Sequence, residues 1–420
     1  MRAAEPTTPG ASLDNPAIPG GFTALGQFID HDLTSDRTPL ALAQADPLGV
    51  TNFRSPRFDL DSVYGGGPTD ANSLKLYDPA DFAKLLTNGN DLPRIAATGK
   101  AILVEGRNDE QVLINQLHVA FLKFHNRLVD LARADGVPAA AVFETARQAT
   151  RWHYQWMVVH DFLPRIIGQA LVDQLMSVDE KDDGTTKFEF KRKFYKPTNL
   201  AAPMMPVEFP AAAYRFGHSM VRPSYTINAT GPKDIFGPTP NDTNLNGGRP
   251  LPPALIVDWS TLFTTNPGKT PQPSRRIDSR LSLPLHHLPA SVVRQPDRMV
   301  SLAERNLIRG KRVGLPSGQA VARAMKVTPL TNQQLGLTES GWGNEAPLWF
   351  YILKEAELTL GGQRLGAVGG RIIGEVFLGL LELDPTSYVN QATTFRPRSP
   401  LTPVAGRFNM VELLKFAGVA

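Results

Sequence analysis

The segment EQVLINQLHVAFLKFHNRLVDLARA, residues 110–134, decides the fold class. Apolar residues recur along it mostly three or four positions apart, which is the spacing of one face of an α-helix. These residues are Val112, Leu117, Phe121, Phe124, Leu128 and Leu131. Asp135-Gly136 and then Pro138 follow, and such residues are typical of the end of a helix. The segment therefore predicts one long helix that ends near residue 134.

Helical patterning also occurs on both sides of this segment. We expect further helices from about 139 to 164, around 218, from about 289 to 327 and over 346–384. Pro164 is expected to end or kink the first of these, because proline lacks a backbone N–H. The alternating KFEFKRKFY at 187–195 predicts a short hairpin, and the Pro-, Gly- and Asn-rich residues 228–275 predict a long surface connection. The expected fold is mainly α, with long irregular loops and little β structure.

The sequence contains no internal repeat and no clean boundary between domains. Its 420 residues are enough for one large domain or for two to three ordinary ones. Residues 1–22, rich in Pro, Gly, Ala and Thr, are expected to form an extended N-terminal arm. Residues 23–420 are expected to form a single large domain.

The composition excludes several classes of protein and site. Net charge is only +4, and the basic residues form no stripe with aromatic side chains, so nucleic-acid binding is not expected. The absence of cysteine excludes disulfides, zinc–thiolate sites, iron–sulfur clusters, thiolate-ligated haem and haem attached through cysteine. The first residues lack the apolar core of a signal peptide, and no apolar run is long enough to span a membrane. We expect a soluble protein, whose cellular location and oligomeric state stay open.

The stretch GQFIDHDL, residues 26–33, is the first candidate for chemistry. His31 lies between Asp30 and Asp32, and Gln27 precedes it by about one helical turn. Taken alone, this arrangement fits a metal site, a general base or an exposed polar turn.

Three other segments carry polar residues in helical contexts: VEGRNDEQ (104–111), YRFGHSMV (214–221) and ERNLIRGKRVGLPSG (304–318). In the first, Arg107 lies three residues before Glu110; in the second, His218 lies among apolar residues. In the third, Asn306 and Arg309 share one face of the predicted helix.

Together these motifs make the sequence similar to the animal-type haem peroxidases of the peroxidase–cyclooxygenase superfamily, the group that includes myeloperoxidase and lactoperoxidase. The resemblance extends from about residue 23 to 384, with the motifs in the family's order. It implies a mainly helical domain around a buried haem. The compact chain without cysteine looks like a prokaryotic member.

The resemblance implies a role for each residue beside the haem iron. His31 matches the distal histidine, which takes a proton from hydrogen peroxide and returns it to the departing oxygen. Arg107 matches the distal arginine, which stabilises negative charge as the O–O bond breaks, and Gln27 matches a hydrogen-bonding residue beside the iron. His218 matches the proximal iron ligand, and Asn306 matches the acceptor of its second N–H.

Other matches concern the edge of the haem. Arg215 and Arg309 match basic residues near the propionates, where arginine can pair with a carboxylate through two hydrogen bonds. Asp30 and Glu110 match the carboxylates that form ester bonds to haem methyl groups. Gln111 replaces a methionine that forms a third link in some relatives, so no sulfonium bond is expected. The implied cofactor is haem b or an ester-linked haem.

The resemblance also implies a calcium site next to the distal histidine. Its ligands would be Asp32, Ser55, the carbonyl of Arg57, Asp59 and Asp61, an oxygen set that suits a hard cation. Asp61 replaces the usual serine or threonine and adds a negative charge, which could tighten the site or change its geometry.

The implied function is a peroxidase that reduces hydrogen peroxide and oxidises halide, thiocyanate, phenols or other small organic donors through an oxoferryl species. One alternative is a haem-dependent fatty-acid dioxygenase, which needs a radical tyrosine near the haem. In cyclooxygenase that tyrosine lies three residues before the proximal histidine; here Arg215 holds that position, and the side chain of Tyr214 is expected to point elsewhere. A second alternative is a catalytically idle, calcium-stabilised adhesion or interaction module, against which the matched distal and proximal residues argue.

Five further polar residues are expected to have no chemical role. His118 and His125, seven residues apart, are assigned to helix packing, as are His153 and His160. Asp109 is expected to be only a polar neighbour of Glu110.

Overall fold

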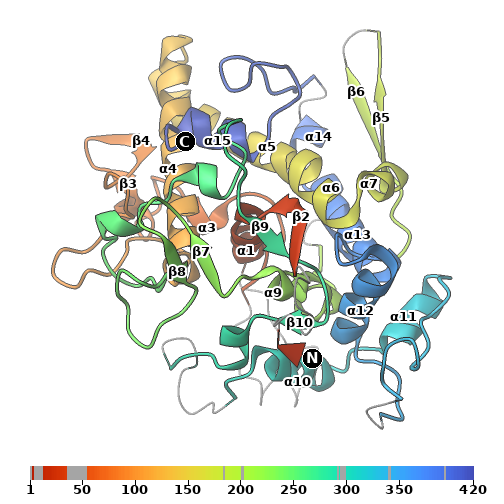
Figure 1. Cartoon of the computed structure of the whole chain (residues 1–420). Helices are drawn as coiled ribbons and strands as arrows, with labels where there is room; N and C mark the ends of the chain where they lie inside the picture. Colours follow the sequence, from red (N-terminus) through yellow and green to blue (C-terminus); the bar gives the residue numbers. More distant parts are fainter. Residues whose placement is uncertain are drawn as a thin grey trace.

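The computed structural model describes residues 2–3, 13–35, 54–182, 185–199, 203–290, 293, 299–338, 342–391 and 394–420. Helix α1 (Gly21–Leu33) lies near the centre of the described part of the molecule, and longer helices lie around it (Figure 1). The fold is mainly α, as the sequence predicted.

The long helix predicted from periodicity is confirmed as α4 (Val112–Ala134). Gln111 begins it, because its side chain accepts a hydrogen bond from the N–H of Leu113 and so satisfies a backbone donor that the helix leaves open. Gly136, with φ of 76°, follows its end. Helix α4 packs against α1, against α5 (Val142–Met157) and against the C-terminal α15 (Met410–Ala417).

The second predicted helix is also present but does not end at Pro164. Helix α5 runs into a π-helical turn, η5 (Val158–Phe162), and then into α6 (Leu163–Ile167). Pro164 lies in the first turn of α6, where a missing N–H costs no essential bond within that helix. The chain leaves the helix only at Gly168, which has φ of 87°.

The predicted C-terminal helical region is a pair, α12 (Leu348–Leu360) and α13 (Ala367–Leu383). Helices α10 (Leu302–Arg312) and α11 (Gly318–Ala324) cover only part of the range predicted as helical from 289 to 327. The other helices are short: α3 (Asp61–Tyr64), α7 (Gln169–Leu175), α8 (Glu208–Ala211), α9 (Gly217–Met220) and α14 (Tyr388–Gln391). Single 3₁₀ turns are η2 (Leu74–Leu76), η3 (Gly106–Asp109), η4 (Ala139–Ala141), η6 (Ala213–Phe216), η7 (Pro253–Leu255), η8 (Trp259–Thr261) and η9 (Leu283–His286).

In the described part of the chain, every sheet has two strands. The pairs are β1 (Arg2–Ala3) with β10 (Arg280–Leu281), β2 (Asp14–Pro19) with β9 (Pro273–Arg275), β3 (Tyr77–Asp78) with β4 (Asp81–Leu85), β5 (Met176–Glu180) with β6 (Thr186–Phe190), and β7 (Ser224–Thr226) with β8 (Pro232–Asp234). Only β1 and β10 are parallel.

The hairpin predicted over 187–195 was wrong in its pairing. Strand β6 pairs with β5, which precedes it, and the two project from the body of the molecule (Figure 1). Residues after β6 turn inward instead, because the buried carboxylate of Glu375 accepts hydrogen bonds from the backbone N–H groups of Lys193, Phe194 and Tyr195.

Aromatic packing fixes α1 in the core. The ring of Phe28 stacks on Phe121 of α4 with 4.6 Å between centroids, and it meets Tyr154 of α5 edge-on. The N-terminal end of α1 approaches Phe263 so closely that a Cβ on Gly21 would lie 2.2 Å from that ring. Such contacts hold α1, and the polar residues it carries, at a defined position in the core.

Glu355 joins the two C-terminal helices. Its carboxylate accepts hydrogen bonds from the N–H groups of Val368 and Gly369 at the start of α13. Burial raises the pKa of Glu355 to about 7, and these backbone N–H groups offset the effect only in part. Because this pKa lies above that of an unfolded glutamate, the stability contribution is present at acidic pH and is lost as pH rises through about 7.

We therefore expect Glu355→Gln to raise the melting temperature at pH 8 relative to wild type and to leave it unchanged or lower at pH 5. The upper bound on the gain is about 3 kcal/mol, from the size of the pKa change. Glu357→Gln on the same helix is the control of opposite sign, because Ser279 and Lys354 lower the pKa of Glu357 despite its partial burial. An equal change in melting temperature from wild type to Glu355→Gln at both pH values would contradict the prediction.

Candidate active site

A cavity of about 420 Å³ brings together most of the residues that the sequence singled out. Its lining includes Gln27, Asp30, His31, Arg107, Glu110, Arg215, His218 and Arg309. Glu110 directly follows η3, and the others come from α1, η3, η6, α9 and α10, segments far apart in sequence. Apolar side chains complete the wall, among them Phe22, Phe162, Leu285, Leu288 and Val313. Asn306 lies behind the wall and contacts His218.

His31 is a neutral, buried imidazole. Its Nδ1 lies 2.8 Å from Oδ1 of Asn108, and only 4% of the residue is exposed. Burial, and then the charge of Arg107, lowers the pKa of His31 to about 4. A ring that is uncharged at neutral pH and donates from Nδ1 has Nε2 available to accept a proton.

Asn108 links His31 to a second histidine through hydrogen bonds. Its Nδ2 lies 3.0 Å from Nδ1 of His118 on α4, and both residues are buried. The sequence analysis assigned His118 to packing and did not single out Asn108. The structure instead adds both to the surroundings of His31. The one signal in the sequence was the position of Asn108 directly after Arg107.

Glu105 holds Arg107 at the cavity wall. Its carboxylate accepts from Arg107 Nε at 2.9 Å, from Nη2 at 3.0 Å and from the backbone N–H at 3.0 Å. Nη2 also donates to the carbonyl of Thr34 at 2.5 Å, and Nη1 lies 3.9 Å from Asp30. Burial alone would raise the pKa of Glu105, but the hydrogen bonds and charge of Arg107, with those of Arg54, lower it to about 2. The guanidinium is therefore fixed by an ionised partner.

His218 lies 2.8 Å from Asn306, measured between Nδ1 and the amide Nδ2. The role of Asn306 as acceptor for an iron-bound ring stays a prediction, and in this structure the amide nitrogen, not its oxygen, faces the ring. The reason is that the amide oxygen accepts from Arg215 Nη1 at 3.4 Å, which turns the amide nitrogen toward the ring. Burial, and then the charge of Arg215, lowers the pKa of His218 to about 3, so this ring is also neutral.

Tyr214 also differs from expectation. Its side chain lines the cavity, and its hydroxyl donates to the carbonyl of Gly26 at 3.1 Å. The expectation that it would point elsewhere was wrong, because residues four apart in a helical segment lie on the same side. The predicted neighbour role of Asp109 agrees with its contacts, since its carboxylate accepts two hydrogen bonds from Arg94.

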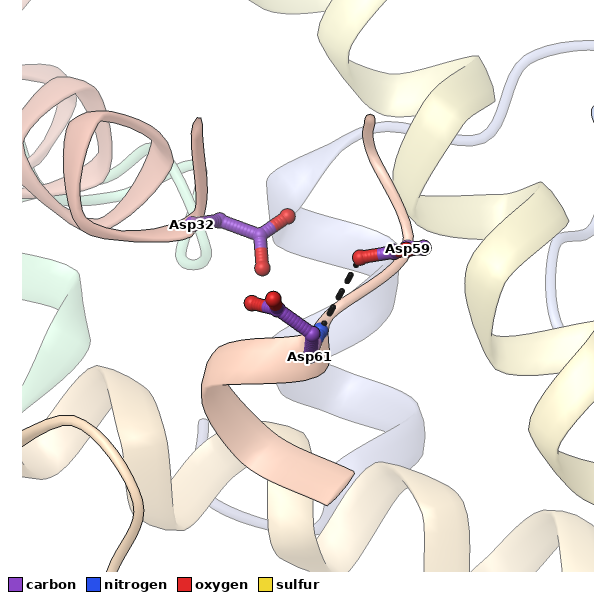
Figure 2. A group of neighbouring side chains, drawn as sticks. All are labelled: Asp32, Asp59 and Asp61. Carbon is purple, nitrogen blue, oxygen red and sulfur yellow. Dashed lines mark hydrogen bonds between the residues drawn. The ribbon is translucent and has the colours of Figure 1, made fainter. Parts of the chain in front are cut away.

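Next to His31 in the chain, Asp32 takes part in a cluster of three carboxylates (Figure 2). Asp32 is on α1, Asp59 is in the loop that precedes α3, and Asp61 is the first residue of α3. One oxygen of each lies within 4.8 Å of the others. Leu60, between two of them, has the left-handed φ of 56°, a strained conformation for a residue other than glycine.

Like charges make this cluster unfavourable without a counter-charge. Burial, then Asp59 and Asp61, raises the pKa of Asp32 well above its usual value, and burial with Asp59 raises that of Asp61 to about 6. Ser55 belongs to the same group, since its hydroxyl donates to Asp59 at 2.7 Å. Arg57 lies in the same loop, and its N–H donates to the carbonyl of Ser55.

Arg54 connects the carboxylate cluster to the cavity. It donates to Asp61 at 3.2 Å and to Glu105 at 2.6 Å, and only 7% of its side chain is exposed. Since Glu105 holds Arg107, one chain of charged contacts runs from the cluster to the cavity wall.

Residues 37–339 match the sequence profile of the animal haem peroxidases, which is most of the chain. The chain belongs to the animal haem peroxidase family. The family is one whose members hold a haem, and the site described above agrees with the resemblance seen in the motifs.

Two peroxidases are similar in sequence to less than half of the chain. Chorion peroxidase of Aedes aegypti is 29% identical over 44% of this chain and 24% of its own length. Human thyroid peroxidase is 27% identical over 43% of this chain and 21% of its own length. The aligned part is thus about a quarter or less of each of these relatives.

Solved structures share the fold over nearly all of the chain. Peroxidase A of Dictyostelium discoideum superimposes with a TM-score of 0.66 at 18% identity, over 94% of this chain and 84% of its own. A fatty acid alpha-dioxygenase of Oryza sativa gives 0.66 at 15% identity, over 99% of this chain and 74% of its own. At these identities the likeness concerns the fold.

The cavity fits a haem by the chemistry of its residues. Two neutral imidazoles, those of His31 and His218, line the cavity, and metal-binding histidines bind through an uncharged ring. Arg215 and Arg309 are two cations that could pair with propionates, and the apolar lining suits a porphyrin. None of the helices in the described part of the chain has the length and apolar character that crossing a bilayer requires.

Glu105 offers a test of the distal cation. In Glu105→Gln we expect the reaction of the haem-loaded protein with hydrogen peroxide to slow about tenfold, because Arg107 loses its ionised partner and leaves its position. Stopped-flow absorbance of the Soret band measures this rate. Glu144→Gln, at an exposed pair with Arg147, is the matched control and should not change it. A wild-type rate in a folded Glu105→Gln protein would contradict the role of Glu105.

Proposed function

We propose that the protein is a haem-dependent peroxidase that reduces hydrogen peroxide and oxidises small reductants such as halide, thiocyanate or phenols. The observation that carries this proposal is the neutral His31, with Arg107 beside it, on a cavity that His218 also lines. A bound haem would supply the iron that binds peroxide and the electrons for its reduction. His218 would hold the iron, and Arg215 and Arg309 would pair with the propionates.

The distal residues move and stabilise charge. His31 would accept a proton at Nε2 from one oxygen of hydrogen peroxide and donate it to the other, which leaves as water. Arg107 stabilises the negative charge that develops as the O–O bond breaks. Gln27 lines the same cavity and can hydrogen-bond to water or a halide there.

On the proximal side, the amide of Asn306 would have to turn. Iron bound at Nε2 of His218 requires the proton on Nδ1, which then needs an acceptor. The oxygen of Asn306 can take that place by rotation about its Cβ–Cγ bond, at the expense of its contact with Arg215.

Asp30 and Glu110 line the cavity as carboxylates, in agreement with the proposed ester links to haem methyl groups. The amide of Gln111 caps α4, and its position carries no thioether for a third link. Mass spectrometry of acid-treated protein after peroxide turnover tests the links. Haem that stays on the chain in wild type and is released from the double variant Asp30→Asn/Glu110→Gln would support them; haem extracted from wild type would refute them.

The function is tested by haem reconstitution followed by steady-state turnover. We expect a Soret band that changes on addition of peroxide and turnover with at least one of bromide, iodide, thiocyanate and a phenol at the same peroxide concentration. A Soret band that peroxide does not change, with no turnover, would overturn the peroxidase proposal and favour a catalytically idle module.

A fatty-acid dioxygenase is the second candidate, because Tyr214 lines the cavity, where a tyrosyl radical would be needed. Oxygen uptake with a long-chain fatty acid separates the two functions. Uptake lost in Tyr214→Phe with peroxidase turnover retained would favour the dioxygenase. Its absence in wild type would exclude that candidate.

We also infer that Asp32, Asp59 and Asp61 bind calcium, with Ser55 and the carbonyl of Arg57 completing the ligands. Support comes from carboxylate oxygens that converge within 4.8 Å. Burial and then the neighbouring carboxylates raise the pKa of Asp32 and of Asp61, and a cation would cancel this repulsion. The ion would anchor α1 next to His31.

Removal of calcium by a chelator should lower the melting temperature by several degrees. A ligand present at a hundred times its dissociation constant stabilises a fold by about 2.7 kcal/mol. Calcium should restore the wild type but not Asp59→Ala. Asp61→Ser, which carries a residue usual at this position in the family, should keep calcium binding and serve as the control. A melting temperature insensitive to chelator would contradict the site.

A further inference from the structure

We propose that Asn108 and His118 are positioning residues that determine which ring nitrogen of His31 carries its proton. This inference rests on the proposed function, because it concerns the nitrogen that would accept a proton from peroxide. Neither residue lines the cavity, so any effect on chemistry passes through His31.

The three side chains come from three elements and form one continuous chain of hydrogen bonds. His31 is on α1, Asn108 is in the turn η3, and His118 is on α4. The two links are 2.8 Å and 3.0 Å long. The three residues are 4%, 0% and 2% exposed, so water cannot replace either partner. Leaving a buried polar group without a partner costs about 1–3 kcal/mol, which makes this chain hard to rearrange.

The amide of Asn108 selects the tautomer of His31. A neutral imidazole has one N–H and one bare nitrogen. The amide oxygen can only accept, so the Nδ1 that faces it carries the proton and Nε2 is bare. If the amide were turned, its NH₂ would donate to Nδ1, the proton would move to Nε2, and His31 could not accept a proton on the cavity side.

His118 in turn selects the orientation of the amide. Its Nδ1 faces the NH₂ of Asn108 and acts as the acceptor. Burial lowers the pKa of His118 to about 4, so the ring is neutral and has a bare nitrogen to offer. Without that acceptor, both amide orientations would satisfy His31 equally, and the protein would lose its preference for the useful tautomer.

The backbone fixes Asn108 in the same turn as the distal cation. Its N–H donates to the carbonyl of Glu105 at 2.9 Å, and the carboxylate of Glu105 binds the N–H and side chain of Arg107. One short turn thus presents Arg107 to the cavity and Asn108 to the rear of His31. An asparagine here aligns the base and the cation together.

The tautomer can be measured without haem. In full-length apo-protein labelled with ¹⁵N-histidine, we expect the nitrogen shifts of His31 to show a protonated Nδ1 and a bare Nε2. Asn108→Asp should keep this pattern, because a carboxylate also accepts from Nδ1. Asn108→Ala and His118→Leu should both give a mixture of tautomers. His125→Leu, which removes a buried histidine of α4 that bonds to Tyr64 and Ala83, is the matched control and should leave His31 unchanged.

The haem-loaded protein gives the second measurement. The rate of the Soret change with peroxide should fall about tenfold to a hundredfold in Asn108→Ala and less in His118→Leu, with recovery in Asn108→Asp. Should Asn108→Ala fail to fold, His118→Leu and Asn108→Ser test the same chain.

A protonated Nε2 in wild-type apo-protein, or wild-type tautomer and rate in folded Asn108→Ala, would overturn the proposal. The nitrogen shifts test it even if the protein shows no peroxidase turnover, so its failure and that of the proposed function are distinguishable.

Discussion

The His31→Ala variant is expected to bind haem but to react with hydrogen peroxide about 10²–10⁴-fold more slowly than wild type, which is the range for loss of a general acid–base group. The imidazole lies on the cavity wall with a pKa lowered to about 4, so it is uncharged at neutral pH. Alanine removes the acceptor and leaves solvent as the only base. Stopped-flow absorbance at the Soret band, at several peroxide concentrations, gives the rate constant.

The control is His287→Ala, which removes an exposed histidine that does not line the cavity. It should react like wild type. Imidazole added to the buffer should restore part of the rate in His31→Ala, because the cavity left by the side chain can admit a small base. A folded, haem-loaded His31→Ala protein that reacts at the wild-type rate would refute the assignment of His31 as the base.

The sequence predicted helices correctly where apolar residues recurred at helical spacing over a long uninterrupted stretch. The segment 110–134 contained the whole of α4, and 346–384 contained α12 and α13. The hairpin at 187–195 failed because alternation identifies a strand but not its partner. The inward turn after β6 depends on Glu375, which is 182 residues from Lys193 in sequence and which no local pattern reveals.

For the site, the motifs identified His31, Arg107 and His218, and the structure places all three residues at one cavity. Asn108 was not singled out and His118 was assigned to packing, because the hydrogen bonds that join them to His31 exist only where α1, η3 and α4 meet. A residue type and its spacing do not give the direction of a hydrogen bond.

The same limit applies to Asn306 and Tyr214. Asn306 was placed beside His218 correctly, but the orientation of its amide depends on Arg215, which competes for its oxygen. Tyr214 was judged by its offset from a motif in other proteins, whereas its side chain follows the local helical turn into the cavity. In both cases the sequence identified the neighbourhood, and the packing decided the contact.

His218→Ala should have the other large effect, on haem binding. In the proposed function His218 would hold the iron, and the other histidine among the described residues that line the cavity is His31, which is assigned to proton transfer. We expect reconstituted His218→Ala to bind haem at least tenfold less tightly and to show a weakened, shifted Soret band. The reason is that removing a side chain that binds a metal typically weakens metal binding strongly. Haem titration followed by absorbance gives the affinity.

Two further measurements separate iron ligation from general packing. Imidazole should restore the Soret band of His218→Ala, because it can occupy the space of the missing ring and bind the iron. Asn306→Ala should keep the haem but shift its reduction potential, because Asn306 contacts the side chains of His218 and Arg215 but does not itself line the cavity. If His218→Ala binds haem with wild-type affinity and spectrum, the iron is held by another residue. The cavity would then have to be assigned again from its remaining wall.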